Sequence, residues 1–133
     1  MINPKIKICG ISDIDILKQL ISFNLDYVGF IFYSKSPRFV DEAFLEKIQD
    51  IDFKDTRPVC VYVNADEDFI YKTSSFFNNP ILQFHGDEDQ NFCETFGLDY
   101  WKAIRIKDEN DIEKISQYNS ASAVILENHK DGT

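Results

Sequence analysis

The sequence predicts an α/β fold in which parallel strands alternate with helices. Short segments of apolar and β-branched residues recur along the chain, and nearly every one is followed by a stretch with apolar residues at helical spacing. No linker or low-complexity segment divides the 133 residues, which suffice for one sizeable core. Strands and helices in this order form βαβ units with right-handed crossovers. We therefore expect a single domain over residues 1–133.

The first half of the chain supplies three strands and three helices. Residues 27–33 form an almost continuous apolar and aromatic run, as expected of a parallel strand covered on both faces. The first helix carries Ile14, Leu17 and Ile21 at helical spacing, and Ser12 or Asp13 is its expected N-cap. The expected strands are 5–9, 27–33 and 58–63, and the expected helices are 13–24, 41–51 and 66–77.

The second half continues the alternation. Pro80 opens a short fourth strand, and Ile112 and Ile115 mark the apolar face of the last helix. The expected strands are 81–84, 101–106 and 123–127, and the expected helices are 90–96 and 109–118. The chain thus holds five βα units and one further strand.

Composition excludes several classes of partner. The net charge of −9 and the lack of a basic run argue against sequence-independent binding of nucleic acid. No stretch approaches the roughly 20 apolar residues of a membrane span, and the N-terminus lacks a signal-peptide pattern. The three cysteines are odd in number and widely spaced, which indicates neither a disulfide framework nor a zinc site. We expect a cytoplasmic protein with reduced thiols.

Cys9 is the first candidate for chemistry. It ends the first strand just before Gly10, where parallel α/β folds place their functional groups. Strand alternation puts Lys5, Lys7 and Cys9 on an inner face and the two intervening isoleucines toward the helices. A lysine ammonium below a thiol favours the thiolate, which can act as a general base. The alternative is simple packing, which we expect for the other two cysteines.

Polar residues at two further strand ends are also candidates. Arg38 follows the second strand in SKSPRFV, where its guanidinium can grip a carboxylate or remain a solvated loop side chain. Gln83 and His85 share one face of the fourth strand, where they line a site or bond each other. His129 is the only other histidine, and no acidic cluster matches His85, so we expect no metal site.

Four segments together resemble the phosphoribosylanthranilate isomerase family, whose members are (β/α)8-barrel enzymes of tryptophan biosynthesis. They are KIKICG, GFIFYSKSPRFV, ILQFHGDED and WKAIRI, and the similarity extends over the whole chain. The resemblance implies a parallel (β/α)8 TIM-barrel type of fold, incomplete here because eight strands need about 200 residues or more. An open doubly wound sheet is the alternative. The chain ends in Asp131-Gly132-Thr133, similar to the start of the family's GGTG stretch, so we expect the N-terminal part of a longer barrel.

The resemblance also implies roles for individual residues. Cys9 corresponds to the general base, and Arg38 to the residue that contacts the anthranilate part of the substrate. Gln83, His85 and Lys7 would line the substrate site. Glu127 stands where the family has an aspartate as general acid, and its extra methylene shifts the reach of the carboxyl group. Asp131, in place of the first glycine of GGTG, is a second departure.

The implied activity is an isomerisation without cofactor or metal. The substrate would be the phosphosugar N-(5-phosphoribosyl)anthranilate, converted to the carboxyphenylamino-deoxyribulose phosphate by an Amadori rearrangement. Phosphate sites of such barrels lie after strands seven and eight, so we expect this chain alone to be inactive and to self-associate through open sheet edges. The alternatives are a non-catalytic half-barrel interaction module and another phosphosugar-converting barrel enzyme.

Overall fold

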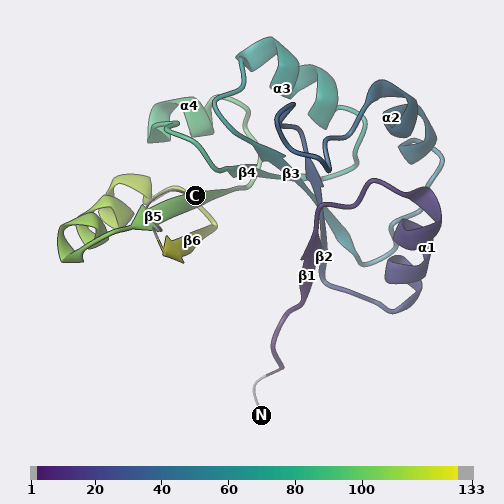
Figure 1. Cartoon of the computed structure of the whole chain (residues 1–133), viewed down its shortest axis with the longest axis horizontal. Coiled ribbons are helices and arrows are strands. Elements are labelled where there is room, and N and C mark those ends of the chain that lie inside the picture. Colours follow the sequence, from purple (N-terminus) through teal and green to yellow (C-terminus); the bar gives the residue numbers. More distant parts are fainter. Residues whose placement is uncertain (1–2, 129–133) are drawn as a thin grey trace.

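A curved parallel sheet with helices along its outer face makes up the computed structural model, which describes residues 3–128 (Figure 1). Its strands are β1 (Lys7–Cys9), β2 (Tyr27–Ile31), β3 (Arg57–Tyr62), β4 (Ile81–Phe84), β5 (Tyr100–Ile106) and β6 (Ala123–Asn128). Its helices are α1 (Ile14–Ser22), α2 (Glu42–Ile48), α3 (Glu67–Ser74), α4 (Gln90–Glu94) and the 3-10 helix η1 (Glu109–Tyr118). The end Asp131-Gly132-Thr133 lies outside the described residues.

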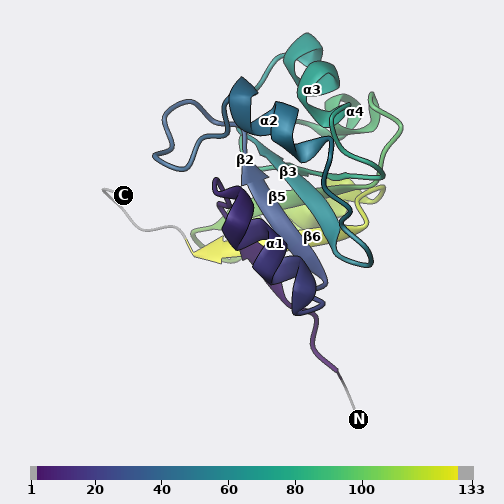
Figure 2. The same ribbon diagram turned by 90° about the vertical axis from the view of Figure 1, so that its right-hand side faces the viewer.

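The six strands lie in the sheet in the order in which they occur in the chain, and every neighbouring pair is parallel. A doubly wound sheet reverses its strand order at a switch point, and no reversal occurs among these strands. The direction of the strands turns from β2 to β6 (Figure 2), which is the twist expected of such a sheet. The arrangement confirms the expected incomplete barrel and is inconsistent with the doubly wound alternative.

Aspartates start all four α-helices. Asp13, Asp41, Asp66 and Asp89 each accept a hydrogen bond from a backbone N–H in the first turn. Such a cap satisfies a donor that the helix leaves free and contributes about 1 kcal/mol. Of the two expected caps of α1, Asp13 is the one used.

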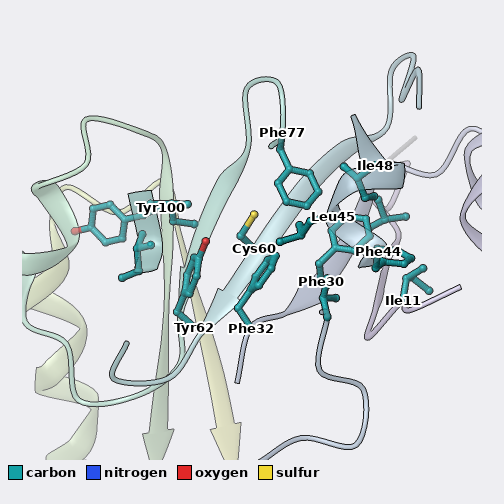
Figure 3. Packing of buried hydrophobic residues seen from close by; sticks show 14 of the residues in the cluster. Ile11, Phe30, Phe32, Phe44, Leu45, Ile48, Cys60, Tyr62, Phe77 and Tyr100 are labelled. Atoms are coloured by element: carbon teal, nitrogen blue, oxygen red, sulfur yellow. The ribbon is translucent and has the colours of Figure 1, made fainter. Parts of the chain in front are cut away.

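The main core lies between the sheet and the helices and is rich in aromatic rings (Figure 3). Phe30 packs against Phe77 with ring centroids 5.1 Å apart, and Phe32 stacks on Tyr62 at 5.4 Å. Cys60 is fully buried in this layer, as expected, and burial raises the pKa of its thiol. The outward-facing strand residues therefore hold the helices against the sheet, and the inner face takes no part in this packing.

A second, smaller cluster covers the inner face of the sheet. Val59, Val61 and Ile81 form its buried part, and Cys9 packs against it. Tyr27 and Trp101 meet edge to face nearby, with centroids 4.8 Å apart. Apolar packing thus fills the middle of the inner face, below the carboxyl ends of the strands.

The last helix differs from its expected form. It spans the expected residues but is a 3-10 helix, and none of its residues is buried. A capping box between Asp108 and Asp111 tightens its first turn. Three residues per turn place Ile112 and Ile115 in one row, yet Ile112 remains 54% exposed. The predicted helix and its bounds are confirmed, while its 3-10 form and its exposure are findings of the structure. Separately, no helix among residues 3–128 has the length and apolar character needed to cross a membrane.

Candidate functional site

The predicted site residues gather along the carboxyl edge of the inner face. Cys9 ends β1, His85 directly follows β4, and Glu127 is the penultimate residue of β6. Arg38 lies in the loop after β2, close to β1. Parallel strands end at the same edge of a sheet, so side chains 118 positions apart in the sequence share one rim.

The thiol of Cys9 occupies space that a glycine leaves free. Gly29 is its register partner on β2, and a Cβ at that position would lie 2.8 Å from Sγ. The next residue, Gly10, has a φ of +84° that side chains rarely adopt, and its N–H donates to the Gly29 carbonyl oxygen at 2.9 Å. Two glycines therefore shape the end of β1 around the thiol.

Arg38 lies across this same turn. Its Nη1 donates to the Cys9 carbonyl oxygen at 3.3 Å, and a Cβ on Gly10 would lie 2.3 Å from that nitrogen. The Ser36 hydroxyl accepts from the Arg38 backbone N–H at 3.1 Å, which fixes the local turn. The guanidinium is thus held at the backbone of Cys9, and the Arg38 side chain remains exposed to an anion from solvent.

Lys7 lies below Cys9 on the inner face and is directed across the sheet toward β4. Its Nζ donates to Gln83 Oε1 at 2.5 Å and lies 5.6 Å from the centre of the Trp101 ring. Loss of water around the ammonium lowers the pKa of Lys7, and the nearby Cys9 opposes that shift. The sequence predicted the inward direction of Lys7 but not its contact with Gln83.

Gln83 and His85 bond each other, which is one of the two expected possibilities. Gln83 Nε2 lies 3.2 Å from His85 Nδ1, and His85 Nε2 lies 2.8 Å from Glu127 Oε1. Together with Lys7, these residues form a line of polar contacts from β1 through β4 to β6, which we name the polar chain. Nothing in the sequence indicates the His85–Glu127 contact, because the two residues are far apart in the chain and β4 and β6 are not neighbouring strands.

A buried ion pair that the sequence analysis missed supports the loop after β4. Lys102 and Glu88 are each 3% exposed, and Lys102 Nζ lies 3.2 Å from Glu88 Oε1. Lys102 also donates to the Gly86 carbonyl oxygen at 2.5 Å, and Glu88 accepts from the backbone N–H groups of Asn64 and Gly86. The signal in the sequence was a lysine inside an apolar strand, because such a charge requires a partner. The pair fixes the backbone next to His85.

An open hollow of about 450 Å³ lies beside this loop. His85, Lys102 and Arg105 are among its lining residues, but Cys9, Arg38 and Glu127 are not. The hollow is therefore adjacent to the polar chain and does not lie over the thiol. Among residues 3–128, no three His, Cys, Asp or Glu side chains come together as metal ligands would.

Comparison with known proteins points to one family. Residues 6–133 match the family described as N-(5'phosphoribosyl)anthranilate (PRA) isomerase. The N-(5'-phosphoribosyl)anthranilate isomerase of Marinomonas sp. (strain MWYL1) is 34% identical over 131 residues, covering 98% of this chain and 64% of that protein. The isomerase of Thermoanaerobacter pseudethanolicus is 39% identical over 122 residues, covering 90% of this chain and 59% of that protein.

Solved structures agree. The phosphoribosylanthranilate isomerase of Thermotoga maritima superposes with a TM-score of 0.83 at 26% identity, covering 98% of this chain and 64% of that chain. A related isomerase structure in complex with reduced 1-(o-carboxyphenylamino)-1-deoxyribulose 5-phosphate gives a TM-score of 0.81 at 27% identity, covering 96% and 66% of the two chains. The chain spans about six tenths of the length of the curated relatives it matches. Because the family match extends over nearly all of the sequence, the chain belongs to the N-(5'-phosphoribosyl)anthranilate isomerase family.

Proposed function

We propose that this chain supplies the acid and the base of an isomerase that converts N-(5-phosphoribosyl)anthranilate to 1-(o-carboxyphenylamino)-1-deoxyribulose 5-phosphate. In this proposal it is one domain, the N-terminal part of a (β/α)8 barrel. The observation that carries the proposal is the arrangement of a thiol, a guanidinium and a carboxyl group along one rim, on Cys9, Arg38 and Glu127. The binding of a reduced carboxyphenylamino-deoxyribulose phosphate to a related structure supports the choice of substrate.

The first step would be opening of the sugar ring. The carboxyl group of Glu127 gives its proton to the furanose ring oxygen, and the ring C–O bond breaks as the nitrogen lone pair forms a C=N bond. The product is a Schiff base with a free hydroxyl group. A positioned carboxylic acid is suited to this task as a general acid.

The second step would be removal of the proton at C2. The Cys9 thiolate takes this proton, and the electrons of the C–H bond form an enol-amine that tautomerises to the ketone. The thiol lies at the carboxyl end of β1, next to the turn at Gly10. Acid and base thus act on different atoms of the sugar from opposite ends of the rim.

Arg38 would hold the anthranilate carboxylate in a bidentate pair. Its contact with the Cys9 carbonyl oxygen is long, at 3.3 Å, so a carboxylate competes for the guanidinium at little cost. None of residues 3–128 is assigned to the substrate phosphate. The reaction requires no cofactor, and we place it in the cytoplasm, where the unpaired thiols of Cys9, Cys60 and Cys93 remain reduced.

The test is an assay of substrate fluorescence on a chimera. The chain is joined to the C-terminal third of the Marinomonas isomerase, at the point where the two sequences stop aligning. We expect conversion of the substrate, a loss of at least about a hundredfold on Cys9→Ser, and a similar loss on Glu127→Gln. Glu113→Gln, the same change on the exposed surface of η1, is the control and should leave turnover unchanged. A folded chimera without conversion would contradict the proposed function.

A further inference from the structure

The polar chain runs from β1 to β6, the strands that carry the two ends of the proposed catalytic rim. Only one assignment of hydrogen-bond donors and acceptors fits its contacts. Lys7 Nζ meets Gln83 Oε1 at 2.5 Å, Gln83 Nε2 meets His85 Nδ1 at 3.2 Å, and His85 Nε2 meets Glu127 Oε1 at 2.8 Å. Gln83 is only 3% exposed, so water cannot satisfy its amide if a donor faces a donor or an acceptor faces an acceptor.

The Lys7 ammonium determines the donor and acceptor roles of the groups that follow it. An ammonium group only donates hydrogen bonds, so the amide atom that faces it must be the oxygen of Gln83. The nitrogen of the same amide then faces His85, and an amide nitrogen also only donates. His85 Nδ1 must therefore accept, and the proton of the neutral imidazole is on Nε2. That proton lies toward Glu127 Oε1, which serves as acceptor.

We propose that Lys7 and Gln83 are positioning residues, which fix His85 in its Nε2–H tautomer and so reserve Glu127 Oε1 as an acceptor. The proton that Glu127 donates is then held on Oε2, the oxygen that does not face His85. This second statement rests on the proposed function, whereas the tautomer of His85 follows from the contacts alone. In this proposal Lys7 and Gln83 act through His85, whereas the sequence predicted that all three line the substrate site.

Burial stabilises this orientation of the Gln83 amide. The Lys7 ammonium lies against the Trp101 ring and the Gln83 oxygen, and its charge is satisfied by these two groups in a partly desolvated place. Turning the Gln83 amide by half a rotation would set its NH2 group against this cation and its oxygen against His85. The cost of a buried donor without a partner opposes that turn.

The tautomer can be measured on the 133-residue chain without any catalytic assay. The chain contains two histidines, so His129→Gln leaves His85 as the only one. Long-range ¹H–¹⁵N correlation of ¹⁵N-histidine distinguishes a protonated from an unprotonated ring nitrogen. We expect His85 to carry its proton on Nε2, with Nδ1 unprotonated.

Two substitutions test the cause of this preference. Lys7→Met removes the group that orients the amide, so the Nε2–H preference should be lost or reduced. Gln83→Glu replaces the donor at Nδ1 by an acceptor and should move a proton to Nδ1. Lys5→Met is the matched control: it removes the same charge from the same stretch of chain, but Lys5 lies over the Tyr27 ring at 5.9 Å and outside the polar chain. It should leave the His85 signals unchanged.

A proton on Nδ1 of the parent chain, or identical His85 signals in Lys7→Met and Lys5→Met, would overturn the proposal. In the chimera, Lys7→Met should lower kcat by tenfold or more with KM nearly unchanged. A rise in KM alone would instead make Lys7 a substrate ligand and overturn its positioning role. An inactive chimera would contradict the proposed function, but it would leave the tautomer result as it stands.

Discussion

At the scale of single residues, the site depends on small groups that leave room for larger ones. The thiol of Cys9 uses the space over Gly29, and Arg38 uses the space over Gly10. Both glycines belong to the segments by which the sequence resembles its family. Their motifs identified Cys9 and Arg38 as candidates, but the reason for the neighbouring glycines became clear only from the distances.

Gly29→Ala tests this use of space. The new methyl group would lie 2.8 Å from Sγ and displace the thiol. A shift of about an ångström can reduce the rate by on the order of a hundredfold, so turnover of the chimera should fall strongly. In the 133-residue chain, the rate at which Cys9 reacts with a disulfide reagent should change as well. Cys60 and Cys93 serve as internal references, since burial raises the pKa of both thiols, that of Cys93 to about 12.

A double-mutant cycle supplies the control. In a Cys9→Ala background the sulfur is absent, so Gly29→Ala should cost less free energy of unfolding than it does in the parent. Equal costs in the two backgrounds would show that the sulfur is not what fills the space.

The limits of residue-scale prediction lie in the polar chain. Strand alternation correctly put Gln83 and His85 on one face, because that rule concerns neighbours in the sequence. The two ends of the polar chain, Lys7 and Glu127, lie on the outermost of the described strands. They reach Gln83 and His85 only because the sheet is curved. Curvature is a property of all six strands together, and no local pattern encodes it.

At the scale of elements, the loop after β4 depends on the buried Lys102–Glu88 pair. Removing one partner of such a pair leaves a buried charge uncompensated and typically costs about 3–5 kcal/mol. Lys102→Met should therefore lower the free energy of unfolding in urea by about that amount. Lys72→Met is the matched control, because the Lys72–Glu42 pair is closer, at 2.8 Å against 3.2 Å, but highly exposed. It should cost much less free energy of unfolding, and equal losses in the two variants would contradict a stabilising role for the buried pair.

The 3-10 helix η1 should respond to acid through Asp111. Its carboxylate accepts from Lys114 and from the backbone N–H groups of Lys107 and Asp108, which lowers its pKa from 3.8 to about 2. Because the folded pKa is depressed, this stabilisation is present above about pH 4 and is lost as the pH falls through about 2. The side-chain ¹³C shift of Asp111 should titrate with a midpoint near 2, and a midpoint near 3.8 would contradict this prediction.

Element boundaries and element type were not equally predictable. The bounds of η1 and β4 agree with the sequence patterns, whereas β1 begins two residues later than expected. Alternation identified the strand residues, but pairing with β2 decides where β1 begins. For η1, isoleucines three residues apart fit both an α-helix and a 3-10 helix, and the capping box at Asp108 and Asp111 tightens the first turn of the latter.

At the scale of the whole molecule, alternation of strands and helices predicted the parallel sheet but could not fix the order of its strands. The choice between a reversed and an unreversed order depends on which distant strands pair, and the family resemblance favoured the correct one. In the part of the chain that the structure describes, β1 and β6 each have only one neighbouring strand. Leu126 on β6 is 56% exposed, and Ile6 beside β1 is 52% exposed.

These edges lead to a prediction about the isolated chain. Strands with an unpaired edge and exposed apolar side chains tend to pair with another copy, so sedimentation should show a mass that rises with concentration. Leu126→Lys should reduce this association. Ile112→Lys introduces the same charge at a similarly exposed isoleucine on η1 and should have little effect. A monomer at all concentrations would contradict the prediction.

The unreversed strand order has a consequence for how the molecule forms. Each strand pairs with the next one in the chain, so the sheet can grow stepwise from its N-terminus as the polypeptide leaves the ribosome. The contact from Lys7 to Gln83 spans 76 residues and must wait until β4 has been synthesised. Glu127 joins later still, once β6 is in place. A nascent chain therefore acquires its sheet gradually. We expect Cys9 and Glu127, the proposed base and acid, to lie on one rim only after β6 has paired, so the proposed proton transfers must wait until most of these strands are assembled.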